Sequence, residues 1–533
     1  MRTLTITLAQ LNWRVGAIEE NAERMLHLVH QQPPSVDLIL FSELALTGYP
    51  PEDLLFRADL HTRCRQQLQR LAQASQQTAI LVGHPWQAEG RLFNALSLFW
   101  QGRLLLRYYK QQLPNYGVFD EQRYFTPGTL AGVVDFKSYR LGVLICEDLW
   151  VDSPIEALKA AGVELVLSLH ASPYDRDKPR RRRQLMARQT QRTALPLIYL
   201  NQVGGQDELL FDGQSQIYTS QGQCCYRLVA FAEQTAVISL QEKQFVSGPT
   251  APLHRSPLAQ IYQALVLALR DYVDKNRFHG VILGLSGGID SALTLAIAVD
   301  ALGHAGVQAV MMPSEYTSLL SHQLAEQQAK QLGVSCSVVS ITPLFEAFRQ
   351  QLHPLLGSDS AGSITQQNLQ ARCRGTLLMA LANHQGKLVL TTGNKSELAV
   401  GYTTLYGDMV GGFAVLKDVS KTVVYQLARY RNRQGEVIPQ QVIARPPSAE
   451  LAPGQHDQES LPPYEILDRL LQGYVEQDQT ADGLVAQGFD PQLVAQVIQL
   501  VDYNEYKRRQ AAVGPRITAR NFGKDRRYPV TYG

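Results

Sequence analysis

Short apolar runs alternate with amphipathic stretches along residues 1–245. Runs rich in leucine and β-branched residues predict strands, whereas apolar residues spaced three and four apart predict helices. The expected strands are 3–9, 38–41, 79–83, 95–100, 104–109, 140–145, 165–169, 197–201 and 216–219, and the expected helix is 19–29. Because strands outnumber the helices between them, we expect a layered α/β sandwich.

This pattern breaks at residues 246–257, where proline, serine and glycine gather. Such a stretch is typical of a linker. Beyond it, the expected strands 281–285, 307–311 and 337–341 alternate with the expected helices 258–273, 292–302 and 321–332. Alternating strands and helices indicate a doubly wound parallel sheet with helices on both faces. We therefore expect two domains, residues 1–245 and 258–533.

Composition narrows the range of partners. Of 533 residues, 45% are hydrophobic, and 50 Lys and Arg against 48 Asp and Glu leave a net charge of +2. So nearly neutral a chain has no overall field to attract nucleic acid or an anionic membrane, and we expect neither as a partner. The four arginines 180–183 have no aromatic residues among them, so we expect a solvated or subunit-facing helix there.

The cysteines and the N-terminal residues bear on the cellular compartment. No two of the six cysteines stand in the C-x-x-C spacing that signals zinc or a redox dithiol. The first residues show no targeting pattern, and no apolar run reaches the ~20 residues of a membrane span. We expect a cytoplasmic protein with reduced thiols.

A glycine-rich hexapeptide, Ser286 to Ser291, follows the strand expected at 281–285 and precedes a helix. Its glycines, Gly287 and Gly288, let the backbone approach a ligand closely, and the amides at the start of a helix attract an anion. The loop lacks both the Gly-Lys-Ser/Thr of a Walker loop and a G-x-G-x-x-G fingerprint. The pattern predicts a phosphate-binding loop of another kind.

This hexapeptide resembles the loop of the N-type ATP pyrophosphatases, which adenylate a carbonyl oxygen and release pyrophosphate. Further segments follow in the order seen in NAD synthetases: 368–375, 391–397, 401–404, 416–422, 445–451, 461–464 and 505–510. The resemblance implies ATP and deamido-NAD as substrates. It also implies Mg²⁺, a hard cation that prefers carboxylate oxygen.

The same resemblance implies roles for individual residues. Those implied to bind ATP are Gly284, Leu285, Ser286, Gly287, Gly288, Ile289, Asp290, Ser291 and Thr392; those implied to bind deamido-NAD are Asn368, Glu397 and Lys507; those implied to hold Mg²⁺ are Asp290 and Glu397. Gln366 and Gln367 stand where the family commonly carries acidic residues. A metal or ribose contact from position 367 is therefore in question.

Cys146 stands at the end of an apolar strand, directly before two acidic residues. Neighbouring negative charge disfavours a thiolate, so this cysteine needs a nearby cation or base in order to react. On this segment alone, a structural cysteine and a nucleophile both remain open. Two other strand ends carry charged residues, Glu43 and Lys110.

Glu43, Lys110 and Cys146, in this order, resemble the triad of the nitrilase superfamily, whose fold is an αββα sandwich. The resemblance implies that Glu43 takes the thiol proton, Cys146 attacks an amide carbon and Lys110 stabilises the oxyanion. The residues implied to hold glutamine are Tyr116, Ser172 and Lys178. His170 stands where relatives often have asparagine, and we expect a packed histidine there.

Together the two resemblances imply glutamine-dependent synthesis of NAD, the final step of NAD biosynthesis. Deamido-NAD, ATP and L-glutamine would give NAD, AMP, pyrophosphate and L-glutamate, a carbon–nitrogen ligase reaction. We expect an internal tunnel, because ammonia is mostly protonated and lost in solvent, and a homo-oligomer, as in the family. Two alternatives stay open: another glutamine amidotransferase with this ATP loop, such as a GMP or asparagine synthetase, and a catalytically silent dinucleotide-binding sensor.

Overall fold

The computed structural model describes residues 2–242, 244–245, 256–357, 363–452, 454–455, 457 and 461–532. The chain divides into two compact units, Met1–Arg255 and Ser256–Gly533. Most of the expected linker, residues 246–255, lies outside the described residues. Residue 257, the last of the expected linker, is instead the first residue of helix α5 (Pro257–Asn276), and the Ser256 side chain caps the N-terminus of this helix.

The N-terminal unit contains two large sheets. Their strand orders are β15-β14-β1-β2-β3-β4-β5 and β13-β12-β9-β8-β7-β6, and a separate ribbon pairs β10 with β11. The strands are β1 (Thr3–Gln10), β2 (Leu38–Phe41), β3 (Ala79–Ala88), β4 (Arg91–Trp100), β5 (Arg103–Tyr109), β6 (Gly132–Phe136), β7 (Tyr139–Ile145), β8 (Leu165–His170), β9 (Leu197–Asn201), β10 (Val203–Gln206), β11 (Leu209–Asp212), β12 (Gln216–Tyr218), β13 (Cys224–Arg227), β14 (Gln234–Gln241) and β15 (Gln244–Phe245). β3 runs past its predicted end at residue 83, because it stays paired with β4 as far as Ala88.

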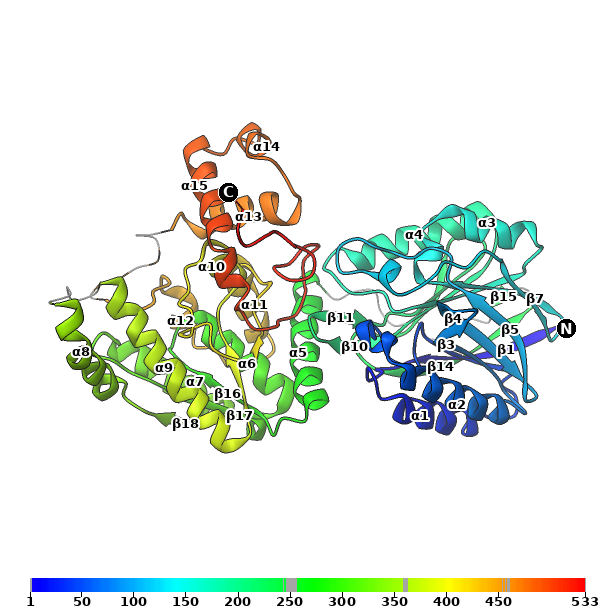
Figure 1. Ribbon diagram of the computed structural model, residues 1–533, viewed down its shortest axis with the longest axis horizontal. Coiled ribbons are helices and arrows are strands. Elements are labelled where there is room, and N and C mark those ends of the chain that lie inside the picture. Colours follow the sequence, from blue (N-terminus) through cyan, green and yellow to red (C-terminus); the bar gives the residue numbers. More distant parts are fainter. Residues whose placement is uncertain are drawn as a thin grey trace. The chain divides into compact units, whose positions relative to one another are not determined.

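Helices cover the outer face of each sheet, which gives the unit four layers (Figure 1). The helices are α1 (Ile18–His30) and α2 (Ala58–Ala74) on the first sheet, and α3 (Asp152–Ala160) and α4 (Lys178–Thr193) on the second. Between the sheets, Ile6 and Leu40 from one share a core with Val143 and Leu167 from the other. The predicted αββα sandwich is confirmed.

The C-terminal unit is built on a five-stranded parallel sheet of order β18-β17-β16-β19-β20. Its strands are β16 (Val281–Gly284), β17 (Val307–Met311), β18 (Ser335–Val338), β19 (Leu388–Thr391) and β20 (Phe413–Ala414). The strand order reverses at β16. Open α/β sheets bind ligands at such a switch point, beyond the carboxyl ends of the strands.

Helices connect these strands and form a further cluster near the C-terminus (Figure 1). They are α6 (Ile289–Leu302), α7 (Leu319–Leu332), α8 (Thr342–Leu356), α9 (Ile364–Gln385), α10 (Lys395–Val400), α11 (Lys421–Asn432), α12 (Gln440–Ala444), α13 (Tyr464–Leu471), α14 (Ala481–Ala486), α15 (Pro491–Tyr503) and α16 (Glu505–Arg508), with a π-helical turn, η6 (Gln472–Glu476), after α13. Residues of α13 to α15 pack against Ala399 and Val400 of α10 in one core.

Several predicted boundaries in this unit are shifted by one to three residues, and two of the shifts have a local reason. α6 begins at residue 289, not 292, because the last residues of the phosphate loop already form its first turn. The strand predicted at 337–341 is β18 (Ser335–Val338), since Ile341 caps the next helix.

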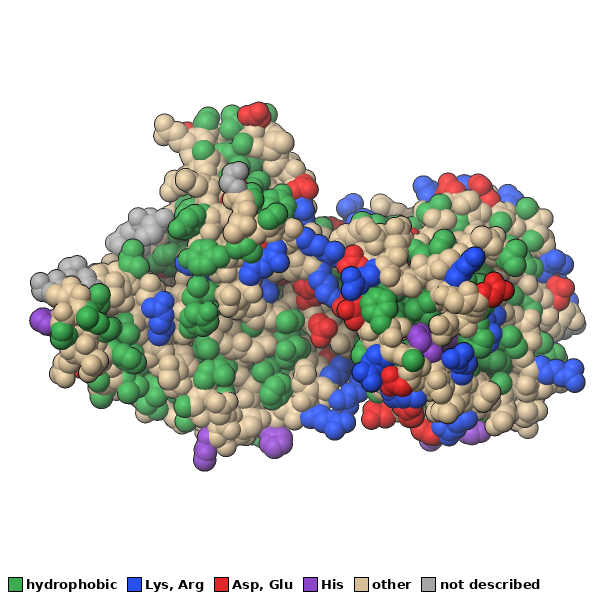
Figure 2. All heavy atoms as spheres, in the orientation of Figure 1, with side chains coloured by type: hydrophobic (Ala, Val, Ile, Leu, Met, Phe, Trp, Pro, Cys, Tyr) green, Lys and Arg blue, Asp and Glu red, His purple; other side chains and the backbone are tan. Residues whose placement is uncertain are grey.

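On the visible face of the N-terminal unit, acidic and basic side chains are interspersed, whereas much of the visible face of the C-terminal unit is uncharged (Figure 2). Among the described residues, no helix is both long and apolar enough to cross a membrane.

Candidate active sites

Cys146 lies at the carboxyl end of β7 and begins a 3-10 turn, η3 (Cys146–Leu149). Its φ of 45° falls in the left-handed region that non-glycine residues rarely adopt, and such positions gather at functional sites. Asp148 braces the turn: its buried carboxylate accepts hydrogen bonds from Ile145 N (3.1 Å), Gln112 N (2.8 Å) and Tyr108 Oη (2.8 Å). The chain therefore holds this thiol on a sharp turn with a fixed backbone.

Glu43 and Lys110 form an ion pair whose two side chains are completely buried. The Lys110 Nζ donates to Glu43 Oε1 at 2.7 Å. Asn94 Nδ2 donates to the same oxygen at 2.9 Å, and the Ala171 amide donates to Glu43 Oε2 at 2.8 Å. The two oxygens of the carboxylate thus accept hydrogen bonds from residues that follow different strands, Lys110 after β5 and Ala171 after β8.

Glu121, which the sequence analysis did not select, joins this pair. It lies in the turn η2 (Glu121–Arg123), and its Oε1 accepts from Lys110 Nζ at 2.8 Å and from Tyr49 Oη at 3.0 Å. Burial raises the pKa of Glu121 to about 7, although Lys110 opposes the rise. Burial alone would lower the pKa of Lys110, but Glu121 and Glu43 outweigh it and raise that pKa well above its usual value.

The Cys146 thiol titrates far above its usual range. Burial raises its pKa, the charge of Glu43 raises it further, and the ammonium of Lys110 opposes both. The resting thiol is therefore protonated, and a base must take its proton before it can attack. The structure brings the predicted Glu43, Lys110 and Cys146 into mutual electrostatic reach.

Tyr116 and Lys178, two of the predicted glutamine ligands, both lie within electrostatic reach of Cys146. Tyr116 is 54% exposed, and its hydroxyl donates to Glu147 Oε1 at 3.0 Å. Lys178 Nζ stands 4.2 Å from the centre of the Trp150 ring, and burial lowers the pKa of Lys178 to about 8. Both side chains therefore belong to the surroundings of the thiol.

Ser172, the third predicted ligand, follows β8 and is buried, with its amide donating to Asn201 Oδ1 at 2.9 Å. His170 at the end of β8 is a packed residue, as predicted: its ring is fully buried, its Nε2 lies 2.7 Å from Ser168 Oγ, and it lies against the ring of Tyr199. Burial lowers the pKa of His170 well below its usual value, so the ring is neutral.

The arginine run 180–183 lies on α4 and is not wholly solvated, contrary to the prediction. Arg182 is buried and pairs with the buried carboxylate of Asp212. Its partner lies on the ribbon strand β11, so the arginine ties α4 to that ribbon. Arg181 is exposed, and its guanidinium pairs with Asp175 at 2.6 Å.

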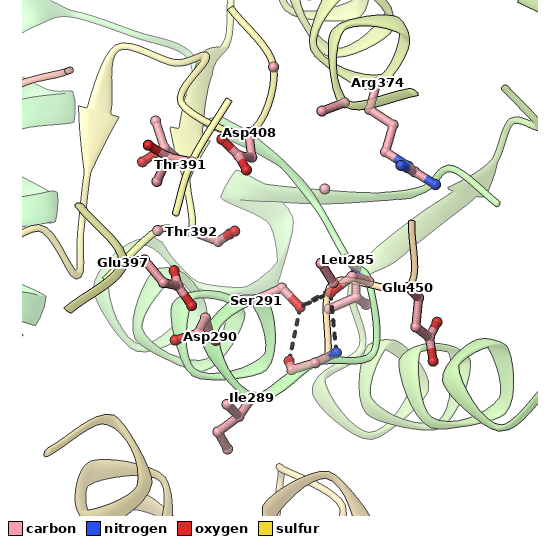
Figure 3. Close-up of a pocket in the computed structure, with 18 of the residues that line it drawn as sticks. Leu285, Ile289, Asp290, Ser291, Arg374, Thr391, Thr392, Glu397, Asp408 and Glu450 are labelled. Carbon is pink, nitrogen blue, oxygen red and sulfur yellow. Dashed lines mark hydrogen bonds between the residues drawn. The ribbon is translucent and has the colours of Figure 1, made fainter. Parts of the chain in front are cut away.

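A pocket opens at the carboxyl ends of β16 and β19 in the C-terminal unit (Figure 3). Of the residues predicted to bind ATP, those that line it are Gly284, Leu285, Ser286, Gly288, Ile289, Asp290, Ser291 and Thr392. Gly287 is not among the lining residues. Its φ of 79° turns the loop, and a Cβ there would lie 2.4 Å from Ser321 O.

Hydrogen bonds within the phosphate loop fix its shape. Ser286 Oγ lies 3.0 Å from Ser291 Oγ and accepts from Gly288 N at 3.2 Å. Arg445 reaches the loop from outside, donating to Gly287 O at 2.7 Å and to Ser321 Oγ at 2.8 Å. These contacts tie the loop to the start of α6 and to Ser321.

Asp290 of α6 and Glu397 of α10 lie side by side in the wall of this pocket (Figure 3). Lys421 bridges them, with its Nζ 2.6 Å from Asp290 Oδ2 and 3.0 Å from Glu397 Oε1. Asn394 Nδ2 donates to Asp290 Oδ1 at 2.8 Å. Burial raises the pKa of Glu397 to about 7; Lys421 opposes this and Asp290 adds to it.

These two carboxylates fit a cation that binds through few protein ligands. Mg²⁺ is commonly held by one or two carboxylates together with substrate phosphates. The described residues contain no cluster of three or more His, Cys, Asp or Glu side chains that could hold a metal by themselves. Any Mg²⁺ in the pocket would therefore depend on the nucleotide for its remaining ligands.

The residues predicted to bind deamido-NAD are split. Glu397 lines the pocket, whereas Asn368 and Lys507 are not among its lining residues. Asn368 Oδ1 accepts from Thr404 Oγ1 at 2.7 Å. Lys507 Nζ donates at 3.0 Å to the backbone oxygen of Thr403, which lines the pocket. At the departure noted in the sequence, Gln367 Oε1 accepts from the Gln455 amide at 3.1 Å.

Several polar residues at this site had no predicted role. Among them are Lys421 and Arg445, which line the pocket, and Asn394, which contacts Asp290. These three lie in segments that carried the resemblance, at residues 416–422, 445–451 and 391–397. A motif shows which segments form the site. It does not show which side chains contact each other, because those contacts form only once the chain has folded.

Comparisons with protein families cover both units. Residues 5–246 match the carbon-nitrogen hydrolase family, and residues 261–511 match the NAD synthase family. The first match ends at residue 246, the first residue of the predicted linker, and the second begins at residue 261, beyond its end.

Whole-chain relatives contain both units. The glutamine-dependent NAD(+) synthetase of Acinetobacter baylyi is 49% identical over 538 residues, covering 100% of this chain and 99% of that protein. That of Thermotoga maritima is 40% identical over 572 residues, covering 100% and 99%. The structure of the Acinetobacter baumannii glutamine-dependent NAD+ synthetase in complex with ADP has a TM-score of 0.81 at 46% identity and covers 99% of this chain and 98% of that chain.

Proposed function

The chain belongs to the family of glutamine-dependent NAD(+) synthetases, and from this premise we propose how its residues divide the reaction. The N-terminal unit hydrolyses L-glutamine to L-glutamate and ammonia. The C-terminal unit uses ATP to adenylate the nicotinate carboxylate of deamido-NAD and replaces AMP with ammonia. The products are NAD, AMP, pyrophosphate and L-glutamate.

Glutamine hydrolysis begins at Cys146. Glu43 takes the thiol proton as the sulfur attacks the amide carbon, and it returns that proton to the departing ammonia. A thioester forms on Cys146, and water, deprotonated by Glu43, releases glutamate. The raised pKa of the thiol supports this order, since a protonated thiol needs a base at the moment of attack.

Lys110 is proposed to stabilise the tetrahedral oxyanion. Its ammonium stays charged because Glu43 and Glu121 lie 2.7 and 2.8 Å from it. Lys110 has two carboxylate partners, Glu43 and Glu121. When Glu43 takes up a proton, Glu121 still lies beside the ammonium, so Glu43 can exchange protons during the reaction. A preorganised cation in a buried site stabilises developing charge more strongly than one in water.

Glutamine itself is proposed to be held by Tyr116, Ser172 and Lys178. The Lys178 ammonium is the cation at the rim of the thiol site and suits the α-carboxylate of an amino acid. Below its pKa of about 8, Lys178 carries the required charge.

ATP is proposed to bind in the pocket of the C-terminal unit, with its phosphates on the loop from Ser286 to Ser291 and with Thr392 beside them. Asp290 and Glu397 would hold Mg²⁺, which supplies positive charge to the phosphates. Lys421 bridges the same carboxylates and lies in the pocket, so its ammonium can stabilise the pyrophosphate that departs. Asn368 and Lys507 are proposed to bind deamido-NAD at the pocket edge.

We also propose that ammonia reaches the adenylate without mixing with solvent, and that the enzyme is a homo-oligomer. An external ammonia scavenger present during turnover tests the first: if it traps most of the ammonia, direct transfer is wrong. Light scattering tests the second.

The observation that carries the proposal is the buried Glu43–Lys110 pair next to Cys146, on a chain that also contains the phosphate loop. The test is a Cys146→Ala variant assayed with glutamine and, separately, with ammonium. We expect glutamine-driven NAD formation to be lost and ammonium-driven formation to remain. Cys64→Ala, at a buried cysteine on α2, is the matched control. Survival of both activities in Cys146→Ala would overturn the thiol assignment, and absence of both in the wild type would overturn the synthetase assignment.

A further inference from the structure

Lys395 places a buried ammonium just outside the ATP pocket, in the first turn of α10. Its side chain is 2% exposed and forms ion pairs with Asp418 Oδ1 at 2.7 Å and Glu476 Oε1 at 2.9 Å. It also donates to Thr518 Oγ1 at 2.8 Å and to Arg520 O at 3.2 Å. One side chain therefore joins α10, the segment before α11, the turn η6 and the C-terminal segment.

This ammonium is charged in spite of its burial. The carboxylates of Asp418 and Glu476 lie 2.7 and 2.9 Å from its Nζ and compensate its charge. Removing one partner of a buried ion pair is strongly destabilising, because the other charge is left uncompensated. The buried carboxylates of Asp418 and Glu476 therefore need the charge of Lys395 for compensation.

Asp418 in turn holds the C-terminal segment that we call the strap, residues 511–518. Its Oδ2 accepts hydrogen bonds from Ile517 N and Thr518 N, both at 2.7 Å. The Thr518 hydroxyl lies 2.9 Å from Asp418 Oδ1 and also contacts Lys395. Lys395 and Asp418 thus fix the far end of the strap together.

The near end of the strap runs beside β20 and the residues after it. Ala414 N donates to Val513 O at 2.7 Å, and Lys417 Nζ donates to Ala512 O at 2.7 Å. Gly514 approaches so closely that a Cβ there would lie 2.2 Å from Ala414 O. The strap is therefore hydrogen-bonded along its length to residues 414–418.

The strap also forms part of the wall of the ATP pocket, because Ala511 and Ala512 line it together with Ala414. The other end of the Lys395 network reaches the pocket through α10. Asn394, which precedes Lys395, donates to Asp290, and Glu397 lies two residues after Lys395 on α10. Lys395 itself is not among the lining residues.

We propose that Lys395 is a positioning residue for the ATP site: through Asp418 it seats the strap as a wall of the pocket, and through α10 it sets the place of Asn394 and Glu397. This inference rests on the proposed function, because it takes the pocket to be the ATP site. It assigns the C-terminal strap a part in nucleotide binding, although the strap is more than 100 residues away from Asp290 and Glu397 in the sequence.

The test is a Lys395→Met variant in the full-length enzyme, which keeps the length of the side chain and removes its charge. Two quantities are measured: binding of ATP with Mg²⁺ by calorimetry, and the KM for ATP and kcat of ammonium-driven NAD formation. We expect ATP binding to weaken and the KM for ATP to rise at least about tenfold, with a smaller change in kcat, since loss of hydrogen bonds to a charged group has effects of this order. Glutamine hydrolysis, which uses the other unit, should stay unchanged.

Lys275→Met is the matched control. Lys275 is a half-buried lysine of the same unit that pairs with Asp271 on α5, and it does not line the pocket. This variant should keep the wild-type KM for ATP. A merely structural role of Lys395 would lower the amount of active enzyme and its kcat without changing the KM, and that result would overturn the proposal.

Thr518→Val provides a second test that is less disruptive to folding. It removes only the hydroxyl that links Lys395, Asp418 and the strap. A rise in the KM for ATP supports the proposal, and an unchanged KM overturns it. This test decides the proposal even if Lys395→Met does not fold. If wild-type enzyme makes no NAD, the proposed function fails; the calorimetric comparison of ATP binding still decides the role of Lys395.

Discussion

Lys421 reaches from α11 to Asp290 on α6, with its Nζ 2.6 Å from Oδ2, although the two residues are 131 positions apart in the sequence. The ammonium also contacts Glu397, so two of the carboxylates that line the pocket share one cation. When a nucleotide binds, its phosphates bring further negative charge to the same place. The pocket therefore contains its own cation before any ligand arrives.

Replacing Lys421 with Met should reduce ammonium-driven NAD formation by roughly 100-fold or more, because two buried carboxylates would then repel the phosphates. Steady-state kinetics with saturating deamido-NAD measures this. Glutamine hydrolysis should not change. Lys387→Met is the matched control, since Lys387 is half-buried and donates to Gln308 Oε1 away from the pocket; an equal loss in both variants would contradict the assignment.

Glutamine binding should weaken as the pH rises above about 8. The pKa of Lys178 is lowered by burial to about 8, so its ammonium loses the proton above that pH and no longer attracts a carboxylate. The KM for glutamine is expected to rise towards tenfold per pH unit there. In Lys178→Arg, which stays charged, the rise should be absent; its persistence would show that Lys178 does not hold glutamine.

Gly287→Ala should abolish ATP binding, whereas Gly303→Ala should not. Both glycines flank α6 and have positive φ values, 79° and 73°, so alanine strains the backbone at each by about 1–3 kcal/mol. Only at residue 287 would the new Cβ clash, at 2.4 Å from Ser321 O; at residue 303 nothing lies within 4 Å. Thermal unfolding measures the backbone strain in both variants, and calorimetry with ATP measures the effect of the clash on binding. Equal ATP affinities of the two variants would refute the role of the loop turn.

Glu121→Gln should remove a pH dependence from the stability of the N-terminal unit. The pKa of Glu121 is raised from 4.5 to about 7, so the folded chain keeps a proton that the unfolded chain releases. The stabilisation is complete below about pH 4.5 and is lost as the pH rises through about 7, a change of about 1–3 kcal/mol. Denaturant unfolding across this range measures it. If wild type and variant follow parallel curves, Glu121 does not titrate as described.

Local sequence patterns determined the elements and their order. The hairpin β4 (Arg91–Trp100) and β5 (Arg103–Tyr109) follows from two apolar runs around Gln101-Gly102, and β16 and α6 follow from an apolar run, two glycines and a helical period. Strand and helix periods are properties of a dozen neighbouring residues, so they can be seen without the fold. Their exact ends cannot, because β3 and α6 extend where tertiary partners are available.

The sequence by itself also indicated both chemistries, since Glu43, Lys110 and Cys146 end strands and the glycine loop precedes a helix. What only the tertiary structure decided is which charges meet: Glu121 with Lys110, Lys421 with Asp290, and Lys395 with Asp418. A charged residue has no periodicity of its own. Whether it is a solvated surface group or a buried partner depends on segments brought together from distant parts of the chain, and the energy of that pairing depends on the burial that folding creates.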